Sequence, residues 1–213
     1  MIVDWPVLSD DEIERLAEDF RSQALDSLGL KSGGAIPVEQ IAEQYLGYEL
    51  EFVDDDGALP GDVIGGIDFD TNTIIINSAI ESHLGRYSFT IAHEIAHHVL
   101  HRELFLKARS GASIMCRGGK KRPIEEVQAD RFAEAFLMPL STIINNCERA
   151  NGLVRYSRRR RLASAAKAIK LTGINNVSLS AMEMRLMHLG FLPSYNSNFS
   201  RTLKAIQARF LAS

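Results

Sequence analysis

The stretch TIAHEIAHHVLH, Thr90–His101, holds four of the chain's six histidines together with a glutamate. His93 and His97 are four residues apart, which on an α-helix means about 40° of rotation and one turn of rise, so both imidazoles lie on one side. Two histidine nitrogens placed in this way can share one zinc ion. Glu94 is rotated about 100° from His93, so its carboxylate can lie beside the metal and accept a proton from a water that the metal acidifies. The stretch therefore predicts the HExxH motif on a helix.

The alternative interpretation is a surface helix with spare histidines, and the rest of the helix argues against it. An apolar stripe follows the opposite side, as expected for a helix that packs on a core: Ile91, Ala92, Ile95, Ala96 and Val99. His98 and His101 lie off the predicted metal-facing side. The long metzincin continuation requires Gly and His where this chain has Leu100 and Glu103, so that class of site is excluded.

A catalytic zinc needs a third protein ligand and an open fourth position. The segment EVQAD offers Glu126, with Asp130 four residues later on the same helical face. A second carboxylate placed one turn from a ligand can hold a ligand histidine through its other ring nitrogen. Glu125 and Glu134 are rival ligands, but only Glu126 has the Asp partner. Acidic residues one turn apart are more often a solvated helix face, so this part of the site stays a hypothesis.

FTIAHEIAHHVLH, followed downstream by EVQADRFAEAFLMP, resembles the ImmA/IrrE family of zinc metallopeptidases, as does the preceding GGIDFDTNTIIINS. The resemblance covers about residues 38–139 well and residues 162–192 less firmly. It implies a zincin-like fold, one zinc ion per chain with a gluzincin-type third ligand, and cleavage of a helix-turn-helix transcriptional repressor that relieves repression. By the same resemblance His93, His97 and Glu126 are zinc ligands and Glu94 is the catalytic base.

Metal-assisted hydrolysis also needs a group that stabilises the oxyanion. The candidates are Tyr156, Tyr87, His98 and His101, and the sequence does not choose among them. The segment TIIINS is expected to be an edge strand that holds an extended substrate by strand addition.

The element pattern predicts an α+β fold. Ser9 and Glu12 form a capping box for a helix that ends at Gly29, and a second helix is expected over residues 37–46. YELEFV is expected to be a strand, and VIGGIDFD and TIIINS a hairpin, so that a small, mainly antiparallel sheet precedes the histidine helix. The basic, glycine-containing KARSGASIMCRGGKKRP is expected to be a mobile loop. The predicted division is a metallopeptidase domain, residues 1–140, and a helical C-terminal subdomain, residues 141–213.

The C-terminal part begins with the basic run RYSRRRR, which includes Arg158–Arg161 and is more often a solvated face than a nucleic-acid site. The following residues predict helix, turn, helix, with Ser180 and Glu183 capping the second helix. That helix offers a poor set of side chains for reading bases: Glu183, Arg185, Met187 and His188. Specific DNA binding is therefore disfavoured against a packing module or a docking surface for a protein substrate. The alternative function is a non-catalytic DNA- or protein-binding regulator with a structural zinc site.

The overall composition, 46% hydrophobic and 24% charged, is typical of a soluble globular protein. A net charge of -3 argues against a protein that coats nucleic acid. No apolar window reaches the length of a membrane span, no secretory signal is recognised at the start, and two cysteines do not suggest a disulfide framework. A cytoplasmic location is expected. Cys116, in the basic loop, is interpreted as a plain exposed thiol rather than an inhibitory zinc ligand.

Overall fold

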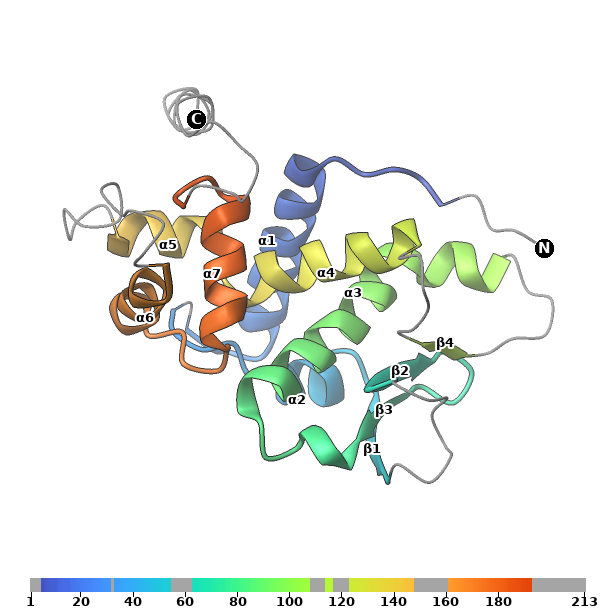
Figure 1. Cartoon of the computed structure of the whole chain (residues 1–213). Helices are drawn as coiled ribbons and strands as arrows, with labels where there is room; N and C mark the ends of the chain where they lie inside the picture. The colour runs from blue at the N-terminus through green and yellow to red at the C-terminus, as the bar shows by residue number, and fades with distance from the viewer. Residues whose placement is uncertain are drawn as a thin grey trace. The chain divides into compact units, whose positions relative to one another are not determined.

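The computed structural model describes residues 5–31, 33–54, 63–107, 114–116, 123–147 and 161–192. The chain divides into two compact units, one formed by Met1–Ser32 and Ile36–Leu137 and the other by Gly33–Ala35 and Met138–Ser213. Figure 1 labels the elements of both. Among the described residues, no helix has the length and apolar character that a membrane crossing requires.

Three long helices build most of the first unit: α1 (Asp10–Ser27), α3 (Leu84–Lys107) and α4 (Ile124–Leu137). The predicted capping box starts α1, since Glu12 N donates to Ser9 Oγ at 3.3 Å and Ser9 N donates to Glu12 Oε2 at 2.8 Å. Helix α4 packs against both α1 and α3. Phe20 of α1 lies against Phe132 and Phe136 of α4, with ring centroids 6.1 and 5.6 Å away. This aromatic contact holds α4 in the core and thereby sets which face of α4 is turned towards α3.

The predicted second helix is present but changes its winding. Val38–Gln40 form the short α-helix α2, and Ile41–Tyr45 continue it as the π-helix η1. Leu46 N donates to Ile41 O at 3.0 Å, which is the wider hydrogen-bond spacing of a π-helix. Ile41 and Ala42 are fully buried, so this turn still supplies the core contacts that its sequence predicted.

A four-stranded sheet lies beside α3 in the order β1-β3-β2-β4 (Figure 1). Its strands are β1 (Glu49–Val53), β2 (Gly65–Asp68), β3 (Thr73–Asn77) and β4 (Ile114–Cys116). The β2–β3 hairpin was predicted, and its turn places Asn72 at φ 53°, a left-handed conformation that Asn tolerates. Strand β1 pairs with β3 in parallel, whereas the other two pairings are antiparallel. The sheet is therefore mixed. The 3-10 turn η2 (Ser78–Ile80) links it towards α3.

Two expectations about this sheet were wrong. TIIINS is not an edge strand, because β3 lies between β1 and β2, which use both of its hydrogen-bonding edges; this removes it as a site for strand addition. The basic segment is not loop throughout, because Ile114–Cys116 form β4 and Met115 pairs with Ile67. The short strand β4 pairs with the edge of β2 that β3 does not use. Residues 108–113 and 117–122 lie outside the described range.

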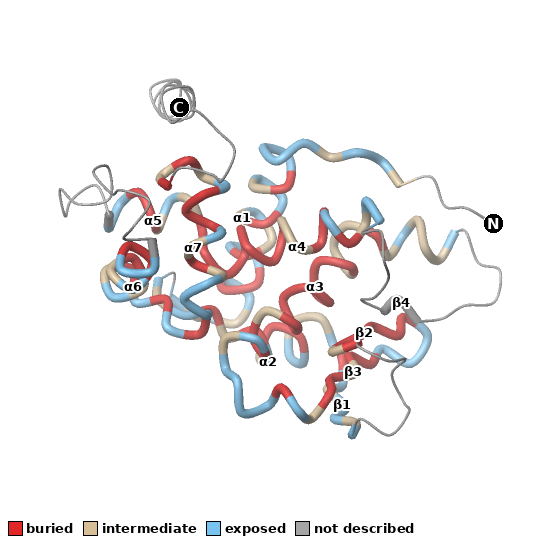
Figure 2. Tube along the Cα trace, viewed as in Figure 1, coloured by how far each residue is buried: buried red, intermediate tan, exposed pale blue. Residues whose placement is uncertain are grey.

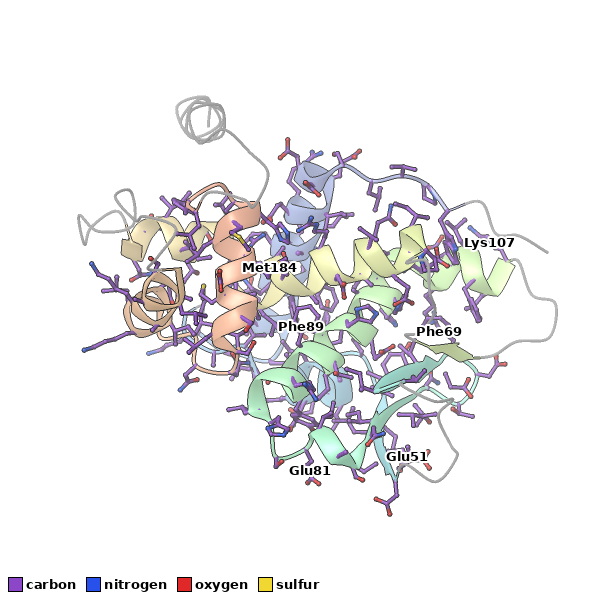
Figure 3. The ribbon with its side chains drawn as sticks, in the orientation of Figure 1. Glu51, Phe69, Glu81, Phe89, Lys107 and Met184 are labelled. Carbon is purple, nitrogen blue, oxygen red and sulfur yellow. The ribbon has the colours of Figure 1, made fainter. Side chains whose placement is uncertain are left out.

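The second unit contains α5 (Leu140–Cys147), α6 (Arg161–Thr172) and α7 (Leu179–His188). Helices α6 and α7 form the predicted helix, turn, helix, but the cap of α7 is Ser178, whose Oγ accepts from Ala181 N at 3.0 Å, rather than Ser180. Met184 is 43% exposed on α7 (Figure 3). Arg185 is buried and donates through Nε to Met138 O at 2.9 Å, so it is unavailable for contacts with DNA. Arg158–Arg160 lie outside the described residues.

Candidate metal centre

His93 and His97 lie on adjacent turns in the middle of α3, where the helix is buried on all sides (Figure 2). Their side chains are 0% and 1% exposed, and their Nε2 atoms are 3.1 Å apart. Helical spacing brings the two nitrogens together, as the sequence predicted, while α4 and the sheet cover them. Two imidazole nitrogens this close together in a buried site are placed to share one metal ion.

The third group comes from α4. Glu126 is 6% exposed, and its carboxylate oxygens lie 3.3 Å from His93 Nε2 and 3.4 Å from His97 Nε2. One ligand atom from each of these three residues falls within 4.8 Å of the others, and in the described part of the chain this is the group of side chains suited to hold a metal ion. Glu134, a rival in the sequence, instead lies 3.4 Å from the Arg131 guanidinium. Glu125, the other rival, is not part of the group.

The spacing of these atoms is compatible with a shared metal ion. A zinc ion about 2.0 Å from nitrogen and oxygen ligands holds tetrahedral neighbours about 3.3 Å apart. The two histidine Nε2 atoms, 3.1 Å apart, match one edge of such a tetrahedron. His93 Nε2 lies 3.3 Å from Glu126 Oε2, and His97 Nε2 lies 3.4 Å from Glu126 Oε1, so the carboxylate faces both nitrogens. Glu126 Oε2 is also buried without a hydrogen bond to any described residue, an arrangement that is costly unless a cation binds there. The donor set and its geometry therefore fit a metal ion.

Asp130 holds His93 from behind. Its Oδ1 lies 3.0 Å from His93 Nδ1, and a carboxylate can only accept there, so Nδ1 carries a proton. In the neutral ring this leaves the Nε2 lone pair facing the group. Burial alone would lower the pKa of His93, but the neighbouring carboxylates of Asp130 and Glu126 raise it to about 9. Burial alone would also raise the pKa of Glu126, yet the neighbouring imidazoles of His93 and His97 keep that pKa well below the usual range. The site is thus built around an anionic carboxylate.

Glu94 follows His93 on α3 and is 1% exposed. It lies outside the three-residue group, as expected for a residue beside the metal rather than bound to it. The start of β2 runs directly past it: a Cβ placed on Gly65 would overlap the γ-methyl of Thr90 and lie 3.3 Å from Glu94 Oε1. The glycine therefore lets the strand approach the helix closely at the position of Glu94.

A family model, Peptidase_M78, described as the IrrE N-terminal-like domain, matches residues 48–187. This is most of the chain, from the residue before β1 to the last turn of α7. The chain belongs to the IrrE N-terminal-like family. The resemblance that the sequence motifs carried is thereby confirmed, and family membership indicates a metallopeptidase. A search of curated proteins gave no match.

In this IrrE-like chain, a second set of contacts surrounds His97 that the sequence did not predict. His97 Nδ1 lies 3.0 Å from His101 Nδ1, and His101 Nε2 lies 3.2 Å from Gln128 Oε1. His101 is 1% exposed, and burial lowers its pKa to about 4. The available signal was the spacing, since His101 follows His97 by the same four residues that separate the two predicted ligands.

The structure does not bring the oxyanion candidates to the three-residue group. His98 turns away from it and bonds through Nδ1 to Tyr48 OH at 2.8 Å, and burial lowers its pKa to about 4. Tyr87 is buried and stacks on Phe52 of β1 at a centroid distance of 6.0 Å. His101 faces His97 rather than open space. Tyr156 lies outside the described residues. The oxyanion group of this IrrE-like chain stays unassigned.

Proposed function

We propose that this chain is a zinc-dependent endopeptidase that hydrolyses a peptide bond in a protein substrate. The observation that carries the proposal is the convergence of His93, His97 and Glu126, whose potential ligand atoms lie within 4.8 Å of one another, with Glu94 one residue beyond the first of them. A structural zinc site usually has four protein ligands, whereas a catalytic site keeps a position open. Three protein groups with an acid–base residue beside them support the catalytic alternative over a structural one.

The roles of the residues follow from their chemistry. Zinc bound by His93, His97 and Glu126 would polarise the scissile carbonyl and lower the pKa of the attacking water. Glu94 accepts the proton of that water and delivers it to the leaving amine. Asp130 keeps His93 in the tautomer whose Nε2 lone pair faces the centre. The small sheet beside α3 supports the further proposal of a zincin-like fold.

We also propose that the substrate is a helix-turn-helix repressor in the cytoplasm, whose cleavage relieves repression. The support for this substrate is the resemblance of the motifs to the ImmA/IrrE family. The second unit is proposed as a protein-docking or packing module rather than a DNA reader, because Arg185 is buried on α7. A non-catalytic regulator with a structural zinc remains the alternative that the experiments must separate.

Two experiments test these roles. Metal analysis should find one zinc per wild-type chain and much less in His97→Ala; full occupancy in that variant would place the metal elsewhere. Glu94→Gln should keep its zinc and fail to cleave a helix-turn-helix repressor that the wild-type chain cleaves, as followed by intact mass spectrometry. The matched control is Glu103→Gln, which makes the same charge change at an exposed position of α3 and should cleave normally. Cleavage by Glu94→Gln at the wild-type rate would refute the assigned base.

A further inference from the structure

A line of buried polar contacts leads from His97 to the segment before α1. It passes from His97 Nδ1 to His101 Nδ1 at 3.0 Å and from His101 Nε2 to Gln128 Oε1 at 3.2 Å. It ends where Gln128 Nε2 donates to the backbone carbonyl of Pro6 at 2.7 Å. The three side chains are at most 2% exposed. The line therefore connects α3, α4 and the N-terminal segment in a dry environment, where each hydrogen bond has a defined direction.

The carbonyl of Pro6 fixes that direction. A carbonyl only accepts, so the amide nitrogen of Gln128 must face it, and the amide oxygen must face His101. That oxygen requires a proton on His101 Nε2, which leaves His101 Nδ1 as an acceptor when the ring is neutral. His97 must then donate from Nδ1, and its proton-free Nε2 points at His93 and Glu126. Each hydrogen bond along the line thus fixes which atom of the next group donates and which accepts.

We propose that His101 is a positioning residue for metal binding, fixing His97 in the tautomer that presents its Nε2 lone pair to the metal. The proposal rests on the proposed metal centre and adds a residue to it. His93 obtains the same tautomer from the carboxylate of Asp130, whereas His97 obtains it from a neutral ring. Both ligand histidines thus have a hydrogen-bond partner that sets their protonation, which is a general requirement for a metal-binding imidazole.

The ring of His101 is itself held in place. Trp5 packs against it edge-on, with ring centroids 5.0 Å apart and planes at 69°. The hydrogen bond to Gln128 holds its far nitrogen. The N-terminal segment therefore contributes two contacts to the line, the Trp5 ring and the Pro6 carbonyl. His101 could serve only as an aromatic ring that packs on Trp5, so a test must separate its packing from its hydrogen bonding.

Two substitutions separate them. His101→Phe keeps an aromatic ring against Trp5 but has no acceptor for His97. His101→Asn loses the ring, yet its carbonyl oxygen can occupy the position of Nδ1 and accept the same proton. Zinc affinity, measured by competition with a chromophoric chelator, should fall about 10- to 100-fold in His101→Phe and stay within about threefold of wild type in His101→Asn. The reverse order, with Phe tolerated and Asn weakened, would show that the ring is only packing and would overturn the proposal.

The tautomer itself can be observed by long-range proton–nitrogen NMR of the histidine rings. We expect the proton on Nδ1 of His97 and on Nε2 of His101 in the wild-type protein, both with and without zinc. A proton on Nδ1 of His101 would refute the relay even if His101→Phe failed to fold. Neither measurement uses a peptide substrate. Absence of repressor cleavage by the wild-type chain would therefore refute the peptidase proposal and leave the relay standing, while unchanged zinc affinity in His101→Phe would refute only the relay.

Discussion

Gly65→Ala should disturb both the stability of the first unit and the position of Glu94. The added Cβ would overlap the γ-methyl of Thr90, while its other close neighbours, Glu94 Oε1 and Ile75 O, would be 3.3 and 3.5 Å away. The clash with Thr90 therefore dominates, and it lies between a strand and a buried helix that cannot easily separate. Gly65 is required here for space, since it is absent from the glycines with positive φ.

The expected cost is that of an overpacked core, about 1–3 kcal/mol. For a chain of this size, each kcal/mol lowers the melting temperature by about 2–4 °C, so Gly65→Ala should melt about 2–12 °C below wild type. Thr90→Ser removes the γ-methyl that causes the overlap, at a cost of its own of about 1 kcal/mol. The loss of unfolding free energy in the double variant should then be smaller than the sum of the losses in the two single variants, by about 0.5–3 kcal/mol.

Urea denaturation of wild type, the two single variants and the double variant measures the coupling free energy between Gly65 and Thr90. Repressor cleavage by the same samples measures the effect on Glu94. The matched control is Gly47→Ala, which places a side chain at φ 76° with no atom within 4 Å. It should be destabilising through backbone strain and additive with Thr90→Ser. The close approach of β2 to α3 is refuted if Gly65→Ala has the same melting temperature as wild type. It is also refuted if the losses of unfolding free energy in Gly65→Ala and Thr90→Ser simply add in the double variant.

Three further substitutions test other parts of the first unit. Asp130→Asn replaces the charged acceptor of His93 and should weaken zinc binding about 10- to 100-fold in chelator competition; unchanged affinity would contradict its supporting role. Phe132→Ala empties a fully buried position and should cost about 3–5 kcal/mol in urea denaturation, so a loss below 1 kcal/mol would argue against the packing described. Ser9→Ala removes the cap of α1 and should cost about 1 kcal/mol, whereas an unchanged melting temperature would show that the capping box contributes nothing.

The parts of the site that follow from helical spacing could be predicted from the sequence. His93 and His97 share a face of α3 because they are one turn apart, and the same spacing places Glu126 and Asp130 on one face of α4. The hairpin between β2 and β3 was also local, since its turn residues adjoin both strands. The parallel partner of β1 was not predictable, because an alternating pattern indicates a strand without naming its neighbour. Strand β4 was hidden for a related reason: its three residues lie within a basic segment.

His101 was visible in the sequence but was placed off the metal-facing side. That placement is geometrically sound, because each step of four residues adds about 40° of rotation, so His101 is turned about 80° from His93. What the spacing could not show is that a histidine beyond reach of the metal still reaches the next histidine. The other members of this line could not be predicted from spacing, since Gln128 lies on another helix and Pro6 is 122 residues from Gln128.

The charges around the three histidines give this division of roles a physical reason. Glu126, Asp130 and Glu94 already place three carboxylates around the proposed centre, more than one divalent cation balances. A further carboxylate in the place of His101 would also hold the Nδ1 proton of His97, but it would add to the excess negative charge in a buried site and weaken the cation's pull on a bound water. A neutral imidazole provides the acceptor without that charge. His93 with an anionic partner and His97 with a neutral one therefore combine correct tautomers with a centre that remains electrophilic.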